Sequence, residues 1–257
     1  DSPTPSETSG GGEAAELLNE AIQAASAISN YEFELRLTQH LSGGSQLNDF
    51  TAKMDMKGKV ELDPLKVDQS VDSEENGQPY SIRGILVPGA YYMYYPEFEE
   101  WSRLSEEQTA EIAGTLSEWQ IAPARALEGL KALGSSLESE QAPSADLVTI
   151  TYDGNGEEAR PFVGRLLTSA MDFTGMDDRV RDSVRIESLH VAVQIDESTH
   201  LPLSYRIESV LSLEYEAGKP ATLTQTLSGD YVNVDGASPV TVPDAAKAAE
   251  VLEPPMD

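Results

Sequence analysis

The sequence contains no cysteine among its 257 residues. Disulfide bonds, thiolate metal sites and cysteine nucleophiles are therefore excluded. Positive charge is also scarce, because 17 lysines and arginines stand against 45 aspartates and glutamates, which gives a formal net charge of −28 at pH 7. Phosphate backbones and anionic membranes repel such a polyanion, so nucleic acid is excluded as a partner. The acidity is typical of a soluble, self-repelling surface and identifies no ligand.

Long apolar runs and catalytic motifs are missing as well. No run approaches the roughly 18 residues that span a bilayer, and the common nucleophile, phosphate-loop, zinc and dinucleotide motifs do not occur. The histidines, His40, His190 and His200, are isolated in sequence and indicate neither a general base nor a metal site. Asp153 begins a stretch similar to a calcium loop, but Glu158 occupies the position that requires glycine. We therefore expect no enzyme activity, no catalytic residue, no cofactor and no metal.

The apolar residues recur at two different spacings along the chain. Apolar residues recur every three or four positions from Glu13 to Ser29 and predict an amphipathic helix. From Tyr31 the period becomes two, and the pattern continues beyond a Gly-Gly-Ser turn at 43–45 as far as Val60, which predicts a hairpin. The helix is expected to lie on the sheet that the strands form.

The rest of the chain continues this α+β pattern. Further strands are predicted at 66–71, 80–87, 90–95, 147–152, 183–195, 203–215 and 222–234, and helices from Ser105, at 123–137 and at 161–171. The strand at 183–195 changes phase between Ile186 and Leu189, which predicts a bulge or a sharp bend. About eight to ten antiparallel strands in one sheet would curl. The predicted fold is a large curved antiparallel sheet, a half-open β-barrel, packed on an N-terminal helix and carrying a helical insertion.

The first twelve residues are rich in Pro, Ser, Thr and Gly and predict a flexible tether. We divide the chain into this tether (1–12), a single domain (13–238) and a C-terminal tail (239–257). The tether is either an ordinary disordered terminus or the linker of an exported lipoprotein. In the second case a lipid-bearing cysteine lies shortly upstream of Asp1, and this anchor is the sole attachment to the outer face of the cell membrane.

The order of the segments resembles a known family. A helix and a meander are followed by the aromatic run Y-Y-M-Y-Y at 91–95, Trp101, a helical insertion and I-D-E-S-T-H-L-P-L-S-Y-R-I at 195–207. This arrangement looks like the LolA/LolB-like lipoprotein fold and, more narrowly, the LppX/LprG-type lipoproteins of Gram-positive bacteria. The resemblance covers about residues 13–236. It implies an apolar cavity for acyl chains between sheet and helices, and it implies no catalytic residues.

A curved sheet either fills its concave face with side chains or leaves room for a ligand, and the sequence leaves both alternatives open. The candidate cavity residues are Phe33, Leu35, Met54, Met56, Tyr92, Tyr94, Tyr205 and Ile207. The candidates for a mobile lid, or equally for a loop plug, are Met171, Phe173 and Met176.

Two functions follow from these alternatives. In the first, the chain is a monomeric, non-catalytic, extracytoplasmic lipoprotein that binds or carries a lipid or another apolar molecule. In the second, it is an envelope interaction or scaffold protein with a filled core and no ligand.

Overall fold

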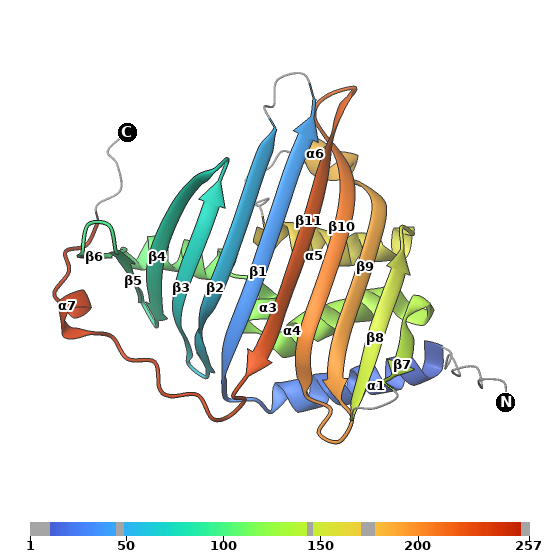
Figure 1. Ribbon diagram of the computed structural model, residues 1–257, viewed down its shortest axis with the longest axis horizontal. Coiled ribbons are helices and arrows are strands. Elements are labelled where there is room, and N and C mark those ends of the chain that lie inside the picture. The colour runs from blue at the N-terminus through green and yellow to red at the C-terminus, as the bar shows by residue number, and fades with distance from the viewer. Residues whose placement is uncertain (1–10, 45–48, 143–145, 171–177, 253–257) are drawn as a thin grey trace.

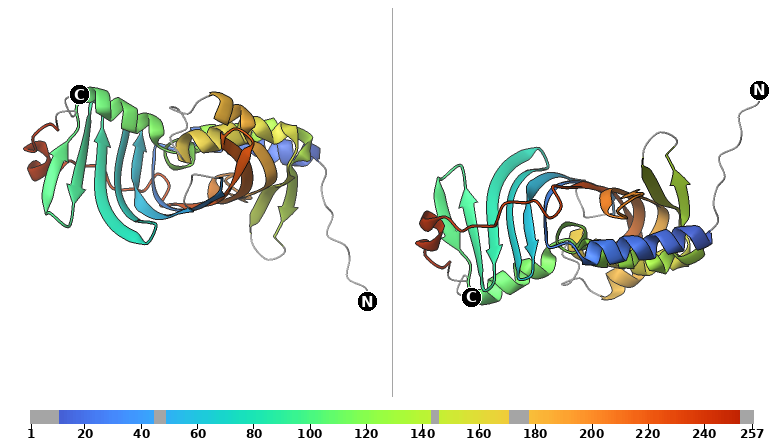
Figure 2. Two further views of the ribbon diagram at one scale, coloured as in Figure 1. Left: turned by 90° about the horizontal axis from the view of Figure 1, so that it is seen from above. Right: turned by 90° about the horizontal axis from the view of Figure 1, so that it is seen from below.

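The computed structural model describes residues 11–44, 49–142, 146–170 and 178–252. Within these ranges the chain forms one open antiparallel sheet of eleven strands, in the order β6-β5-β4-β3-β2-β1-β11-β10-β9-β8-β7 (Figure 1). Most helices lie on one side of the sheet, which we call the inner face, and the opposite side is the outer face (Figure 2). The predicted fold class is confirmed, because the sheet is large, curved, antiparallel and open, and packs with an N-terminal helix.

The sheet consists of two meanders that meet in its centre. The first comprises β1 (Asn30–Gly43), β2 (Phe50–Leu62), β3 (Leu65–Glu75), β4 (Gln78–Val87), β5 (Ala90–Tyr95) and β6 (Glu100–Arg103). The second comprises β7 (Glu138–Gln141), β8 (Leu147–Gly154), β9 (Arg185–Asp196), β10 (Pro202–Glu216) and β11 (Lys219–Val232). The first and last strands, β1 and β11, pair over almost their full length and join the two halves. Residues far apart in sequence therefore become neighbours in the middle of the molecule.

The helical elements precede, connect or follow the strands in the chain. The elements are α1 (Gly11–Ser26), α2 (Glu106–Thr115), α3 (Glu118–Ile121), α4 (Pro123–Gly129), η1 (Leu130–Ser136), η2 (Glu157–Ala159), α5 (Arg160–Ala170), α6 (Asp178–Ser183) and α7 (Asp244–Lys247). Ser105 begins α2 with a reciprocal capping box to Gln108, as its sequence predicts. The helix predicted at 123–137 is divided, since Gly134 adopts a φ of 55° inside η1. No helix in the described ranges is both long and apolar enough to cross a membrane.

Helix α1 confirms the first sequence prediction in its position and its buried face. Ala14, Leu18, Ala21, Ile22 and Ala25 are buried and belong to the main core. The helix packs most extensively against α4 and η1, at one end of the sheet (Figure 1). The apolar face of α1 therefore covers one end of the main core, against α4 and η1.

The segment after β11 runs past the lower ends of β1–β4 in Figure 1 and reaches the edge of the sheet that β6 forms. The backbone N–H of Val240 donates to Oε1 of Glu61 at 2.6 Å. Val240 and Ala246 bury themselves against Ile85 and Tyr92 in a small second core. Most of the predicted tail is thus packed on the sheet, while residues 1–10 and 253–257 lie outside the described residues.

Several short elements were not predicted, namely β6, β7, α3, η2 and α6. Strands β6 and β7 and helix α3 have four residues each, too few to show a period, so the sheet has eleven strands where eight to ten were expected. The predicted irregularity in β9 is confirmed. Val210 of β10 lies opposite Ser188, whereas the next residue, Leu211, lies opposite Ile186, so that Glu187 is the extra residue of a bulge.

Candidate functional site

Six of the eight candidate cavity residues lie on the inner face. Phe33 and Leu35 of β1 and Tyr205 and Ile207 of β10 are almost completely buried in the main core. Met54 and Met56 of β2 pack against that core and stay half-buried. The register places Met56 opposite Leu35 and Met54 opposite Leu37, so these side chains form one continuous surface.

The other two candidates, Tyr92 and Tyr94, lie on the outer face, so their predicted place on the concave face is wrong. Tyr92 pairs with Ile85 and belongs to the small outer core. The ring of Tyr94 lies 5.1 Å from that of Trp101 on the same side. The run Y-Y-M-Y-Y contains no polar residue to reveal its phase, and the inner positions of β5 are Tyr91 and Met93.

Next to α3, the inner face of β1, β10 and β11 is filled by aromatic rings. The ring of Tyr231 lies 5.4 Å from that of Tyr31, edge on, and 5.6 Å from that of Tyr205, which itself lies 4.7 Å from Trp119. The phenol of Tyr205 occupies the space that a side chain at Gly229 would need. Burial raises the pKa of Tyr31, Tyr205 and Tyr231 above the ordinary tyrosine value, so these phenols stay neutral. These rings pack against one another and against α3 on the inner side of the sheet.

The half around β2–β5 is different, because apolar side chains there remain partly exposed. We call Met54, Met56, Ile82 and Met93 the methionine surface. All four project from the inner face and are half-buried, although most of that face is buried elsewhere. Ile112 and Leu116, at the end of α2, are also half-buried against the core, and α2 contacts β5. Met54 and Met56 were candidates in the sequence analysis, whereas Ile82 and Met93 were missed.

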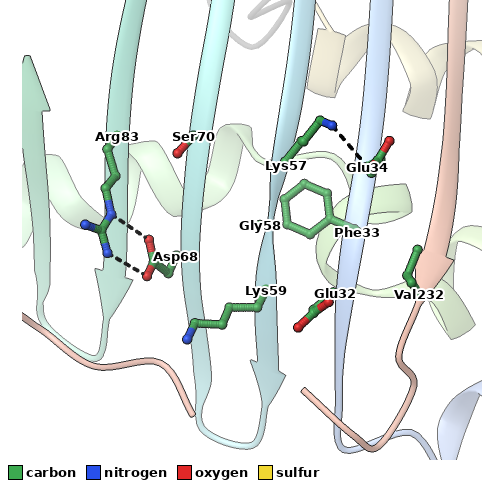
Figure 3. A pocket seen from close by; sticks show the side chains of 10 residues that line it. All are labelled: Glu32, Phe33, Glu34, Lys57, Gly58, Lys59, Asp68, Ser70, Arg83 and Val232. Carbon is green, nitrogen blue, oxygen red and sulfur yellow. Dashed lines mark hydrogen bonds and ion pairs between the residues drawn. The ribbon is translucent and has the colours of Figure 1, made fainter. Parts of the chain in front are cut away.

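The outer face carries a polar hollow of about 520 Å³ over β1–β4 (Figure 3). It is lined by Glu32, Phe33, Glu34, Lys57, Gly58, Lys59, Asp68, Ser70, Arg83 and Val232. Arg83 makes a two-pronged contact with Asp68 at 3.0 and 2.9 Å, and this bond raises the pKa of the guanidinium. Lys57 pairs with Glu34 at 3.3 Å, whereas Lys59 donates to Ser238 and to the carbonyl of Pro239.

The charges of this hollow are therefore engaged with one another or with the C-terminal segment. Three carboxylates face three cations among its lining residues, so the hollow has no excess of either sign that would select a charged ligand. From the sequence, these positions were predicted only to lie on the solvent-exposed face of the strands. Lys57 with Glu34 and Arg83 with Asp68 form cross-strand ion pairs that stabilise the sheet.

A smaller hollow, of about 320 Å³, lies between α5 and α6 and is mainly apolar. Its lining includes Leu167 and Val184, and Arg160 at its rim donates to the carbonyl of Val184 at 2.9 Å. The candidate lid residues Met171, Phe173 and Met176 fall between these helices in sequence but lie outside the described residues.

Two of the three histidines take part in separate surface contacts. His190 lies 3.2 Å from Asp153, and His200 lies 3.4 Å from Glu20, on different elements of the molecule. Within the described ranges, no three histidine, aspartate or glutamate side chains are grouped closely enough to hold a metal ion. The segment D-x-x-T-x-L-P-L is a turn, as the sequence predicts, in which the Asp196 carboxylate accepts hydrogen bonds from Ser198 and Thr199.

Comparison with known proteins gives a family and distant structural similarities. A model described as a family of unknown function, DUF6612, matches residues 13–251. No curated protein is significantly similar in sequence. LprF from Mycobacterium bovis is 12% identical, with 94% of this chain and 100% of that chain covered and a TM-score of 0.44. A LolA superfamily protein from Nitrosomonas europaea is 10% identical, with 90% and 95% covered and a TM-score of 0.29.

Proposed function

The chain belongs to DUF6612, a family of unknown function, and we propose from its own geometry that it is a non-catalytic protein that binds or carries a long-chain apolar molecule. The ligand would lie on the methionine surface, between β2–β5 and the end of α2. The observation that carries this proposal is the partial exposure of Met54, Met56 and Met93 on a face that is otherwise buried.

Partly exposed methionines suit this role for two reasons. Leaving large apolar side chains in contact with water costs free energy that burial against a ligand would recover. The unbranched thioether also adapts to chains of different shape. An acyl chain that buries about 200 Å² of apolar area would gain on the order of 5 kcal/mol before ordering costs, so one chain binds weakly and two bind more tightly.

The cluster of aromatic rings next to α3 limits where such a ligand can lie on the inner face. Phe33, Tyr205 and Ile207, which the sequence assigned to the cavity, are parts of the packed core. They would support the ligand-bearing half without touching solvent. The same packing is the observation that favours the alternative, a scaffold protein with no ligand.

Titration with a fluorescent long-chain fatty acid tests the proposal. Wild type should bind the probe saturably and release it unchanged. Met54→Trp should weaken binding about tenfold, which corresponds to about 1.4 kcal/mol. The reason is that the larger indole would occupy the space of the ligand on the methionine surface. Tyr94→Trp places the same indole on the outer face and should bind like wild type.

Two outcomes would count against the proposal. Absence of saturable binding by wild type would favour the scaffold alternative. Equal binding by wild type and Met54→Trp would place the ligand elsewhere. Location at the outer face of the cell membrane through a lipid anchor stays a prediction based on the composition of residues 1–12, and the gene sequence upstream of Asp1 tests it.

A further inference from the structure

A row of polar side chains crosses the inner face beside the methionine surface. Gln39 of β1 lies opposite Gln225 of β11, and Gln225 lies opposite Ser209 of β10. Their exposed fractions are 9%, 1% and 2%. The neighbouring rows are apolar, with Leu227 on one side of Gln225 and Leu223 on the other, both buried.

Two members of the row have unused hydrogen-bonding capacity. Both Nε2 and Oε1 of Gln225 and Oγ of Ser209 have no hydrogen-bond partner among the described residues. Buried polar groups without partners are rare in proteins because each loses its hydration without compensation. Gln69, another buried inner-face glutamine, shows the usual arrangement, since its side-chain oxygen accepts a hydrogen bond from Gln120.

The row leads to the half-exposed part of the face. Gln39 lies opposite Ala52 of β2, and Met54 is the next inner-face residue along that strand. Ala52 and Met54 are both half-buried. A molecule whose chain covers the methionines could therefore extend along the sheet and place a polar group against Gln225 and Ser209.

From this arrangement we infer that the ligand carries an uncharged hydrogen-bonding group, such as a hydroxyl or an ester, that binds Gln225 and Ser209. This inference rests on the proposed function. The side-chain amide can both donate and accept, and the hydroxyl of Ser209 can do the same. The row itself has no charged side chain to compensate a buried ion, and burying an unpaired charge costs far more than burying a hydroxyl. The ligand class is thus a neutral long-chain alcohol or ester, as opposed to a free fatty acid or a pure hydrocarbon.

Competition with matched compounds tests the inference. The bound methyl ester of a fluorescent long-chain fatty acid is displaced by dodecane, dodecanol or dodecanoate, in wild type and in Gln225→Met. The variant keeps the length of the side chain and removes its hydrogen bonds. The ratio of the dissociation constants of dodecane and dodecanol should fall about tenfold in Gln225→Met, which is the loss of roughly one hydrogen bond to a buried group. Gln69→Met, whose amide is already paired, should leave the ratio unchanged.

The possible failures are distinct. If wild type does not bind the probe, the proposed function and this inference both fail. If the probe binds but the dodecane-to-dodecanol ratio is the same in wild type and Gln225→Met, the row holds internal water only and the inference alone is overturned. Stronger competition by dodecanoate than by dodecanol would also overturn it. A melting temperature of Gln225→Met at or above that of wild type shows that the variant folds and supports the unpaired state of the amide.

Discussion

The hydroxyl of Tyr231 donates a 2.6 Å hydrogen bond to the carbonyl oxygen of Trp119, across 112 positions of the chain. Tyr31 makes the equivalent bond to the carbonyl of Gln120. The two tyrosines belong to the central strands β11 and β1, and the two carbonyls belong to the four-residue helix α3. Such a short helix has little stability of its own. The strands therefore fix its position and, with it, the helix layer of the inner face.

Tyr231→Phe should lower the free energy of unfolding by about 1–3 kcal/mol, because the Trp119 carbonyl loses its buried donor. Chemical denaturation measures the change. Tyr80→Phe is the matched control, since that hydroxyl bonds Glu75 at the surface and its loss should cost about 0.5 kcal/mol or less. Equal effects of the two substitutions would show that the Trp119 carbonyl finds another partner.

Stability should also decrease at alkaline pH. Burial raises the pKa of Tyr31, Tyr205 and Tyr231 above the ordinary value of 10.0. The unfolded chain loses these protons near pH 10 while the folded protein keeps them, so the stabilisation is complete below pH 10 and is lost as the pH rises further. Each tyrosine adds a slope of about 1.4 kcal/mol per pH unit above that value. Denaturation between about pH 8 and 11 tests this, and Tyr205→Phe should reduce the slope by one tyrosine's share.

Ile22→Asp should destabilise the protein by several kcal/mol, since it removes a buried aliphatic side chain of α1 and places a carboxylate in the core. Thermal unfolding measures this directly. Gln23→Asp adds the same charge at the next, exposed position and should change the melting temperature little. An unchanged melting temperature in Ile22→Asp would show that this face of α1 is not buried.

Gly58 lies where β2 and β3 come unusually close. A Cβ built at this position would lie 2.3 Å from the carbonyl oxygen of Asp68 and 3.0 Å from the ring of Phe33. Gly58→Ala should therefore cost about 1–3 kcal/mol through displacement of β3. Gly164→Ala in α5 meets nothing within 4 Å and should be neutral or stabilising by about 1 kcal/mol. Denaturation of both variants separates local crowding from a general effect of removing glycine.

The sequence predicts the fold where polar and apolar residues alternate clearly. In β1 the alternation from Tyr31 to Leu41 predicts both the strand and its buried face, and the structure agrees. In β5 the run of aromatics gives the strand but not the face, so Tyr92 and Tyr94 were assigned to the wrong side. There the side is decided by tertiary packing, because Val240 and Ala246 supply an apolar surface on the outer face.

The polar row is visible in the sequence as two interruptions of the alternating pattern, but the alternation alone does not show that they belong together. Gln39 stands between Leu37 and Leu41, and Gln225 stands between Leu223 and Leu227, each at a position where the pattern calls for an apolar residue. Only the pairing of β1 with β11 brings the two interruptions together. Exposure of the methionines is likewise a matter of which strands the helices cover, and no local pattern contains that information.

An open sheet ends in two strands whose outward backbone groups could pair with another molecule. At β6 this edge is occupied, because Arg103 accepts a hydrogen bond from the N–H of Leu252 at 2.8 Å and donates to the carbonyl of Glu250 at 3.2 Å. The other edge, β7, is only four residues long. The C-terminal segment therefore protects the β6 edge from pairing with another chain. A chain shortened before Glu250 should lose solubility at high concentration while its inner face stays unchanged.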